Sequence, residues 1–351
     1  MEYILDDEDG VVVRGKLNTL IDWYNESLLL FILTSTGDGS GVSTLKMTAS
    51  EDTILTLEQG TARFYSDAGG TQDESTTWTV TAGAERTRYI KCPSGTANFY
   101  IEKDTITSWG QWTSGTNAAS LGGDISVLTS LTSMWVLGSN TLSGSVAALT
   151  SLTTLSVGGS NTVSGSVAAL TSLTYLSVTG SNTLSGDVSA LTSLTYITVT
   201  GSNTLSGSIA ALTSLTWLTV TGSNTLSGSV AALTSLTYLT VLGSNTVSGD
   251  VALISAGITL LYIVGQNQIV TYTAGGDWSS IDNDGTVIVS PGVGYGLSSA
   301  EVDLFIQEVE STRTAGRAIH ITLTGSNAAR TAASDAAVTA IENDGGTVTT
   351  N

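Results

Sequence analysis

An asparagine recurs at every twenty-first position through the middle of the chain. The six copies are Asn140, Asn161, Asn182, Asn203, Asn224 and Asn245. Each lies in a near-copy of the segment L-T-S-L-T-x-L-x-V-x-G-S-N-T-L-S-G-S-V-A-A. A fixed period of this length is typical of a solenoid, because one such unit cannot bury its apolar side chains alone. We therefore expect the repeats to fold as one block in which each coil packs on its neighbours.

One stretch of each repeat alternates apolar and polar residues, as a half-buried strand does. Stacked at one strand per coil, these stretches predict a parallel sheet with neighbouring strands about 4.8 Å apart. The predicted strands are Met134–Val136, Leu155–Val157, Leu176–Val178, Ile197–Val199, Leu218–Val220 and Leu239–Val241.

The Gly-Ser-Asn that follows each strand is predicted to form a corner of the coil. An inward asparagine there would hydrogen-bond the turn backbones of its own coil and of the next coil, which water does not reach. The alternative is that these are exposed turn asparagines. Six copies in constant phase, with a seventh near Asn267, favour the buried ladder.

The repeat resembles the leucine-rich repeat. Leu152, Leu155 and Val157, followed by N-T-L-S-G-S-V, are similar to the plant-type pattern L-x-x-L-x-L-x-x-N-x-L-x-G-x-I-P. Here the Asn falls one position late, which leaves Ser160 at the usual Asn position, and Ala replaces Pro. The resemblance covers roughly residues 121–351 and implies a parallel sheet on a concave face. The short unit implies a thin convex side without regular helices. Because this family is a binding scaffold with many functions, the resemblance names no partner.

We expect a mainly β chain in four parts. Residues 1–27 form an acidic segment and a short helix, and residues 28–105 form a small antiparallel, sandwich-like β-domain. Residues 106–271 form the leucine-rich-repeat solenoid, and residues 272–351 form irregular repeats and a helix-containing cap.

Residues 28–105 read as short strands between Gly, Asp and Ser turns. The segment Glu58–Thr61 is predicted to be a hairpin connection. The predicted strands are Leu29–Leu33, Thr53–Leu57, Thr77–Val80, Arg88–Lys91 and Asn98–Ile101.

The repeats lose strict period after Val251, and the rest is predicted to close the solenoid. Val287 and Val289 mark a strand, and Ser298 with Glu301 forms a capping box that begins a helix over Ser298–Thr312. A strand begins near Ile321, a last helix covers Ser334–Asn343, and a strand covers Thr347–Thr349. The closing sequence resembles the ends of leucine-rich-repeat proteins of Bacteroidetes and their phages.

Residues 1–27 carry two signals. The acidic run from Asp6 to Asp9 lacks the spacing and distal Glu of an EF-hand, so a solvated turn is favoured over a calcium site. Leu17, Leu20, Ile21 and Tyr24 form a helical stripe. The segment K-L-N-T-L-I-D is similar to short helices near the N-termini of phage tail- and head-fibre proteins. The alternative is a helix that packs on its own β-domain.

Charge and composition exclude several classes of function. The formal charge of −19, with only 11 basic residues, argues against nucleic acid and anionic membranes. Between Ile125 and Gly249 the only charged residue is Asp187. The single cysteine, Cys92, permits no internal disulfide, and the only histidine, His320, is far from it in sequence. The acidic start does not resemble a secretory signal, and the apolar run Leu28–Leu33 is too short to span a bilayer.

The concave face should present three rows of outward side chains. Aromatic rings beside hydroxyls can stack on sugars and complete their hydrogen bonds. The alternative is that these residues are only good cross-strand neighbours. The first row is Thr154, Tyr175, Tyr196, Trp217, Tyr238 and, beyond the strict repeats, His320. The second is Trp135, Ser156, Ser177, Thr198, Thr219, Thr240 and Tyr262. The third is Gly158, Thr179, Thr200, Thr221 and Leu242.

The sequence therefore favours a non-enzymatic structural or attachment protein, without cofactor or metal. The predicted face has no carboxylate pair, no Ser–His–acid set and no phosphate loop. Our first hypothesis is a phage virion component, such as a head or tail fibre or decoration protein, that binds a host-surface glycan or protein. Residues 1–27 would contact other virion proteins. The alternatives are a bacterial cell-surface adhesin and an ice-binding protein, the latter suggested by the T-x-T pairs Thr198/Thr200 and Thr219/Thr221.

Overall fold

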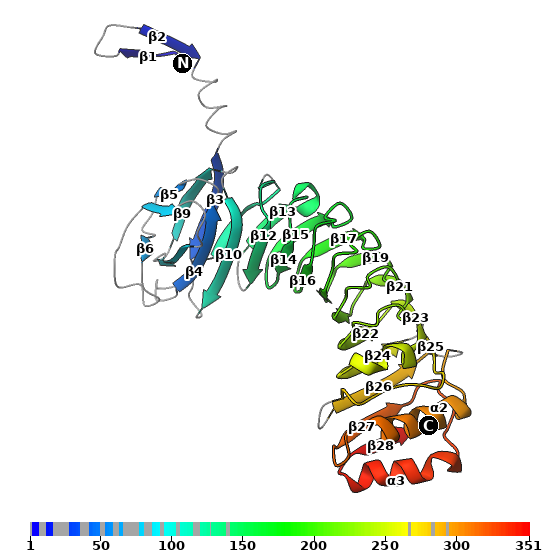
Figure 1. The fold of residues 1–351 in the computed structure, drawn as a ribbon. Coiled ribbons are helices and arrows are strands. Elements are labelled where there is room, and N and C mark those ends of the chain that lie inside the picture. The colour runs from blue at the N-terminus through cyan, green and yellow to red at the C-terminus, as the bar shows by residue number, and fades with distance from the viewer. Residues whose placement is uncertain are drawn as a thin grey trace. The chain divides into compact units, whose positions relative to one another are not determined.

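The computed structural model describes residues 124–126, 128–136, 142–265, 268–281, 285–292 and 295–351 with their side chains. Of the other residues it describes only the backbone of those in strands. The chain divides into two compact units, Met1–Gly144 and Ser145–Asn351. The fold is mainly β, as predicted, with a parallel-strand solenoid and helices near the C-terminus (Figure 1).

The first unit contains a pair of strands, β1 and β2, and two further sheets. One sheet has the order β12-β10-β4-β8-β6 and the other β13-β11-β3-β9-β5-β7. Neighbours from β3 to β9 pair antiparallel, whereas β10–β12 and β11–β13 are parallel. The strands are β1 (Glu2–Asp6), β2 (Val12–Lys16), β3 (Leu28–Ser35), β4 (Val42–Ala49), β5 (Thr53–Glu58), β6 (Arg63–Tyr65), β7 (Thr77–Val80), β8 (Arg86–Lys91), β9 (Gly95–Glu102), β10 (Ile106–Ser114), β11 (Ser120–Asp124), β12 (Ser133–Leu137) and β13 (Thr141–Ser145).

The five strands predicted between residues 28 and 105 are all present. The predicted hairpin at Glu58–Thr61 is wrong, because β5 pairs with β7 and β9 whereas β6 pairs with β8 in the other sheet. The connection therefore crosses between sheets, which a local turn signal does not reveal. The predicted helical stripe from Leu17 to Tyr24 lies outside the described residues, as do Asn140 and Asn267.

In the second unit, the predicted strand of each coil is present and builds one parallel sheet, here called the inner sheet. Its order follows the sequence, so each strand lies between those of the preceding and following coils. The strands are β14 (Thr154–Val157), β16 (Tyr175–Val178), β18 (Tyr196–Val199), β20 (Trp217–Val220), β22 (Tyr238–Leu242), β24 (Leu260–Gly265), β26 (Gly285–Pro291), β27 (Ile319–Leu323) and β28 (Thr347–Thr350).

A second parallel sheet, the outer sheet, forms where the sequence predicted only turns. In each coil the segment T-L-S-G-S after the buried Asn is a strand and not part of the corner. Only the preceding Gly-Ser makes the turn. The strands are β15 (Thr162–Ser166), β17 (Thr183–Asp187), β19 (Thr204–Ser208), β21 (Thr225–Ser229), β23 (Thr246–Asp250) and β25 (Ile269–Thr271).

The interior of each coil is apolar. In one coil it consists of Val188, Leu191, Leu194, Ile197, Val199 and Leu205, each with no exposed surface. Between the two sheets the chain makes tight turns, in which the amide of Leu191 donates to the carbonyl of Val188 and that of Leu194 to the carbonyl of Leu191. Two of these connections are 3-10 helices, η1 (Val146–Ala148) and η2 (Val251–Gly257). Between residues 145 and 271 the described connections contain no α-helix, in line with the expectation for so short a repeat.

The asparagines from Asn161 to Asn245 are fully buried and form a ladder of hydrogen bonds. In Asn203, Nδ2 donates to the Thr200 carbonyl of its own coil at 2.8 Å. Its Oδ1 accepts from the amide of Leu184, in the preceding coil, at 2.8 Å. Asn182, Asn224 and Asn245 make the same pair of contacts. Each asparagine thus joins its coil to the preceding one, and not to the following one as expected.

The ladder changes where the strict period ends. Gln268 follows Asn245 by 23 positions, where the strict repeat has 21. It is fully buried, and its Nε2 donates to the Asn245 carbonyl at 3.2 Å. Its Oε1 has no hydrogen-bond partner. Asn327 is again a buried asparagine that joins two coils: its Oδ1 accepts from the Leu297 amide at 2.8 Å, but its Nδ2 donates to the Val289 carbonyl of the preceding coil at 2.6 Å and not to its own coil. The longer glutamine side chain therefore marks the irregular coil.

The two sheets of the solenoid differ in register. In the inner sheet Tyr175 lies opposite Tyr196, the same position of the next repeat, so equivalent residues are direct neighbours. In the outer sheet Ser185 lies opposite Thr204, two positions short of its own equivalent Ser206, so equivalent residues are offset along the strand. Equivalent points are thus about 4.8 Å apart in the inner sheet and roughly 8 Å apart in the outer sheet. The coils therefore bend with the inner sheet on the concave side (Figure 1).

Close stacking of the outer strands explains the glycine in S-G-S. Gly207 has a φ of +97°, and a Cβ there would overlap the Asp187 carboxylate of the preceding coil. Asp187 in turn accepts a hydrogen bond from the Ser189 amide at 2.8 Å, which begins the next turn. In the other coils the residue equivalent to Asp187 accepts the same hydrogen bond from the amide two residues further on. These residues are Ser166, Ser208, Ser229 and Asp250. Glycine is required at this position because of its positive φ and because the preceding coil leaves no room for a Cβ.

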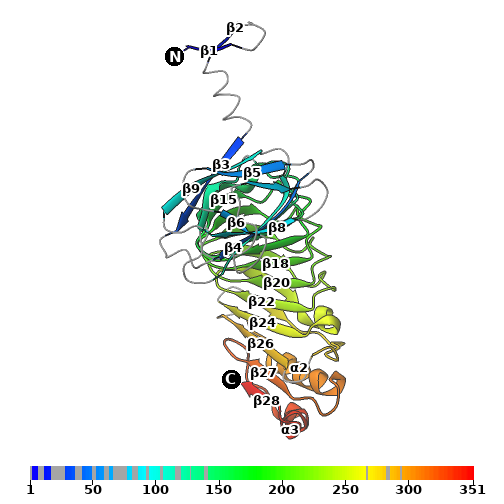
Figure 2. The same cartoon turned by 90° about the vertical axis from the view of Figure 1, so that its left-hand side faces the viewer.

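Helices replace the outer sheet near the C-terminus. They are α2 (Ser299–Thr312), the 3-10 helix η3 (Ala332–Ser334) and α3 (Asp335–Asn343). The capping box predicted at Ser298 and Glu301 is present at the start of α2. Both helices lie beside β27 and β28 (Figures 1 and 2). The cap therefore keeps the inner sheet and covers it with helices.

Removal of one whole coil, Ser172–Thr192, should leave a folded protein, because the remaining coils keep their phase. Removal of only half a coil, Ser172–Ser181, should abolish cooperative unfolding of the solenoid, because an inner strand would be forced into the outer position. Thermal unfolding followed by circular dichroism distinguishes the two. A cooperative transition retained in the shorter deletion would contradict the repeat architecture.

Asn203→Ala should lower the free energy of unfolding by about 1–3 kcal/mol, because it leaves the Leu184 amide and the Thr200 carbonyl without these partners. Thr200→Ala, on the open side of the same coil, should change it by less than about 0.5 kcal/mol. Denaturant unfolding at equilibrium measures both values. Equal and negligible effects would show that the ladder does not contribute to stability.

Candidate functional site

The outward side chains of the inner sheet form straight rows across the strands. In the first row Thr154, Tyr175, Tyr196, Trp217, Tyr238 and Leu260 are successive partners. In the second row the partners are Ser156, Ser177, Thr198, Thr219, Thr240 and Tyr262. The third row, two positions after the second, contains Thr179, Thr200, Thr221 and Leu242. Of the side chains named in these three rows, all but Ser156 are half-buried. The structure thus brings the predicted site residues together on one face.

The four aromatic rings of the first row stack on one another. The ring centroids of Tyr175 and Tyr196 are 4.4 Å apart with an interplanar angle of 7°. Those of Tyr196 and Trp217 are 5.6 Å apart, and those of Trp217 and Tyr238 are 3.6 Å apart at 2°. We call these four side chains the aromatic stack. The ring faces within the stack therefore lie against one another. This differs from the sequence-based expectation, in which sugars would stack on these faces.

The polar groups of the stack point along their own strands toward the second row. The Thr198 hydroxyl donates to the Tyr196 hydroxyl oxygen at 3.1 Å. Trp217 Nε1 donates to the Thr219 hydroxyl at 3.1 Å. These bonds fix the orientation of the rings, so that the row presents ring edges and hydroxyls to solvent.

The environment at the first ring of the stack disfavours ionisation. Partial burial raises the pKa of Tyr175, and the neighbouring Tyr196 hydroxyl raises it further. A hydrogen bond with Ser177 acts in the opposite direction but does not cancel these effects. Tyr175 is therefore uncharged at neutral pH.

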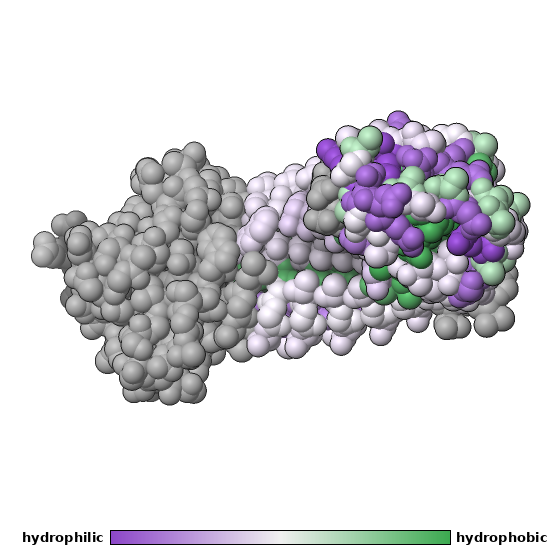
Figure 3. All heavy atoms as spheres, turned by 90° about the horizontal axis from the view of Figure 1, so that it is seen from below, coloured by the Kyte–Doolittle hydropathy of each residue, from purple (hydrophilic) through white to green (hydrophobic). Residues whose placement is uncertain are grey.

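The inner sheet carries no charged side chain in its described strands from β14 to β24. Asp187 and Asp250, the acidic residues of these coils, end the outer strands β17 and β23. Figure 3 shows the coils mostly as white to pale purple with a narrow green strip of hydrophobic residues between them, whereas strongly hydrophilic residues are concentrated, among green ones, over the C-terminal part. A ligand of this face would thus meet aromatic edges and neutral hydroxyls.

His320 continues the first row beyond the strict repeats, as predicted, because the register carries the row from Leu260 through Thr286 to His320 in the cap. It is opposite Thr286 and Thr347 in the inner sheet, and its Nδ1 lies 3.0 Å from the Thr347 hydroxyl. Leu260 and Thr286 lie between it and the aromatic stack in this row. His320 therefore does not share the site with the four rings.

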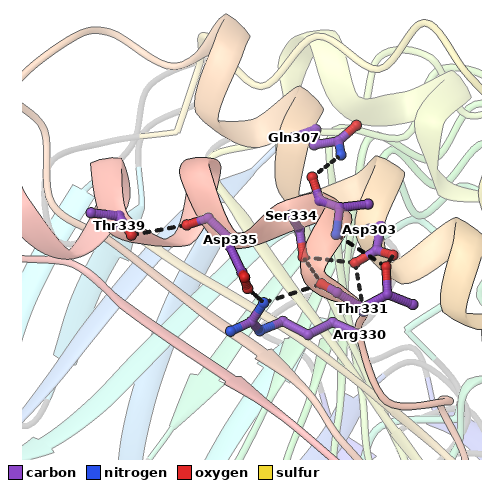
Figure 4. A network of polar contacts seen from close by, with 8 residues as sticks. Asp303, Gln307, Arg330, Thr331, Ser334, Asp335 and Thr339 are labelled. Atoms are coloured by element: carbon purple, nitrogen blue, oxygen red, sulfur yellow. Dashed lines mark hydrogen bonds and ion pairs between the residues drawn. The ribbon is translucent and has the colours of Figure 1, made fainter.

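A polar network stabilises the cap around Asp303 of α2 (Figure 4). Its carboxylate accepts hydrogen bonds from the Thr331 amide at 2.9 Å and from the Ser334 hydroxyl at 2.7 Å. Burial alone would raise the pKa of Asp303, but these hydrogen bonds hold it below its usual value. Arg330 contacts Asp335 at the start of α3. The network fixes the turn between the two helices.

Glu308 performs the same task on the other side of α2. Its carboxylate accepts from the amides of Gly275 and Gly276, each at 2.8 Å, and from the Tyr272 hydroxyl at 2.8 Å. That hydroxyl accepts from Nε1 of the fully buried Trp278 at 2.8 Å. Burial raises the pKa of Tyr272 well above its usual value. These contacts are those of a structural support for the loop before β26, and sequence reasoning missed them because the partners are far apart along the chain.

Two shallow hollows lie along the cap helices, with volumes of about 580 and 450 Å³. Arg313 lines the larger one and is bound to Asp344 at 2.7 Å. Among the described side chains, no group of three or more His, Cys, Asp or Glu is placed to hold a metal ion. No helix in the described part of the chain is long and apolar enough to cross a membrane.

Comparisons with known proteins add little to this geometry. No protein-family model and no curated protein match the sequence. Among solved structures, a crystal structure of a plant ice-binding protein is similar, with a TM-score of 0.29 and 22% sequence identity. The match covers 45% of this chain and 64% of that protein, so the chain spans less than two thirds of its length. A TM-score this low carries no argument about function.

The stability of the cap should depend on the charge of Asp303. Because its pKa in the folded state lies below the unfolded value of about 3.9, the carboxylate stabilises the fold above that pH. The contribution is lost as the pH falls through the folded-state pKa. Asp303→Asn should therefore unfold more readily than the wild type at pH 7, and the difference should shrink toward pH 3. Hydrogen exchange of α3 amides measures it, and a difference independent of pH would contradict this role.

Proposed function

We propose that this chain is a non-enzymatic attachment protein of a phage virion, and that its inner sheet binds a glycan or protein on the host surface. The observation that carries the proposal is the aromatic stack. Tyr and Trp side chains bury a large area at low cost in rotamer entropy and often dominate binding energy. Four such rings in register, on a sheet fixed by the asparagine ladder, form a preorganised binding surface.

The chemistry of the inner sheet supports binding more than catalysis. In the described strands β14 to β24 the outward residues are hydroxyl, aromatic or aliphatic, with no acid or base for proton transfer. His320 lies farther along the same row, beyond Leu260 and Thr286, and contacts Thr347. We therefore propose that the protein recognises its ligand without altering it.

The virion assignment rests on the sequence. The segment K-L-N-T-L-I-D within residues 1–27 is similar to helices of phage fibre proteins, and we propose that these residues contact other virion proteins. A bacterial adhesin would use the same face, and finding the chain in purified virions by mass spectrometry would separate the two. Ice binding is less favoured, because the pairs Thr198/Thr200 and Thr219/Thr221 lie beside the rings of Tyr196 and Trp217, which break a flat plane.

Trp217→Ala should reduce attachment to host cells by about 30-fold or more, since an aromatic hot spot is worth about 2 kcal/mol or more. Thr225→Ala, on the exposed face of the outer sheet, is the matched control and should bind like the wild type. Binding of the labelled protein to cells, with circular dichroism to verify folding, measures both. Attachment should change little between about 50 and 500 mM salt, because the described inner strands from β14 to β24 carry no charge for salt to screen.

Two results would contradict the proposal. One is undiminished attachment of a Trp217→Ala/Tyr238→Ala double variant. The other is a steep loss of attachment with added salt, which would place the binding site on the charged parts of the chain.

A further inference from the structure

We infer that the ligand of the inner sheet is an uncharged linear polysaccharide that lies along the solenoid axis, across the strands. This inference rests on the proposed attachment function and names the ligand class for the same site. It depends on the register of the inner sheet, on its lack of charge and on the orientation of its rings.

The register of the inner sheet places identical contacts at equal steps. Tyr196 lies opposite Trp217, and Thr198 opposite Thr219, so partners are separated by one full repeat. A ligand that runs across the strands thus meets one ring and one hydroxyl at every strand spacing of about 4.8 Å. The outer sheet offers no such row, because its partners are two positions short of a full repeat and equivalent residues are offset. The inner sheet is therefore suited to a ligand that is itself periodic.

The size of this step favours a sugar chain over a peptide. An extended peptide repeats its side-chain direction every two residues, or about 6.6 Å, which soon falls out of phase with a step of about 4.8 Å. One pyranose unit of an extended polysaccharide is about as long as the strand spacing. Each unit could then make the same contacts with successive coils.

The charge of the site selects a neutral polymer. The described inner strands from β14 to β24 carry no basic group to pair with a uronic acid, sulfate or phosphate. Desolvation of such an anion against this surface would cost free energy without an ionic partner to offset it. Hydroxyl groups of a neutral sugar meet no such penalty at Thr200 and Thr221.

The orientation of the rings defines how the sugar would bind. Because the rings are stacked on one another, a sugar cannot insert between them. Their exposed edges carry the positive end of the ring quadrupole, which attracts the oxygen atoms of a sugar. In this row the four rings are bounded by Thr154 on one side and by Leu260 on the other. The binding strip is therefore four coils long, and its affinity should reflect that length.

The test uses neutral β-linked gluco-, xylo- and manno-oligosaccharides of two to eight units, with polygalacturonate as the acidic counterpart. Affinity of the full chain for at least one neutral series should rise with length up to about four units and then level off. Polygalacturonate should bind at least tenfold more weakly. Binding that is independent of length, or is restricted to the acidic polymer or to none of these glycans, would overturn the inference.

Two coil deletions make a matched pair. Removal of Val188–Ser208 takes out Tyr196 and leaves three rings, whereas removal of Val146–Ser166 takes out Thr154 and leaves four. Both remove one full repeat and keep the phase. The first should bind the four-unit glycan about fivefold more weakly, as expected for about 1 kcal/mol per aromatic contact, and the second should bind like the wild type. Equal losses of affinity in the two deletion variants would contradict a binding strip formed by the four rings.

Treatment of the host cells separates this inference from the proposed function. Periodate, which cleaves the vicinal diols of sugars, should abolish attachment, and protease should leave it intact. Attachment that survives periodate but is lost after protease, while still depending on Trp217, would identify a protein ligand. The attachment function would then stand and the polysaccharide inference would fall.

Discussion

The hydrogen bonds of the buried asparagines hold the repeats together. So short a coil has turn amides and carbonyls that its own backbone cannot satisfy, and neither water nor a regular helix is available inside the solenoid. From Asn182 to Asn245, each asparagine supplies one donor to its own coil and one acceptor to the preceding coil. The apolar side chains provide most of the driving force, but they do not set a distance or a phase. The asparagine amide group sets both the distance between coils and their phase, and the two sheets form as a result.

Two different registers on one repeat give the solenoid its curvature. The inner strands stack residue on residue, whereas the outer strands shift by two positions per coil, as Ser185 and Thr204 show. The outer path is therefore longer, and the inner face becomes concave. Only on that face do equivalent residues of successive repeats lie directly opposite one another, so that the rings of the tyrosines and Trp217 contact one another in sequence. The candidate site is thus a consequence of how the coils are joined.

Much of the fold could be predicted from periodicity, but two features could not. The phase of Asn161 to Asn245 and the alternation of strands such as Ile197–Val199 are local patterns that period alone reveals. The outer strands were missed because Gly207 and its neighbours favour turns, and only contact between coils makes them extended. The Glu58–Thr61 connection was misread because a turn signal does not say which sheet the next strand joins.

The candidate site was likewise predictable only in part. The members of each row follow from alternation along the strand, so that Trp217 and Thr219 could be placed on the same face. Which way a ring leans depends on its rotamer and on its neighbours in other coils. The face-to-face contact of Tyr175 and Tyr196, and the bond from Trp217 to Thr219, therefore had no signal in the sequence. Gln268 was missed for a related reason, because its role appears only once the irregular coil is built.

The sameness of the coils has a consequence at the level of the gene. Each coil offers its neighbours the same two surfaces, since the carbonyl, amide and glycine positions recur with little change. Any coil can therefore follow any other, and near-identical stretches of DNA are prone to unequal recombination in frame. Gain or loss of one unit would lengthen or shorten the row of rings by one step without a new folding problem. Variation of this kind would change the length of the solenoid and the number of rings available to a ligand in a single genetic event.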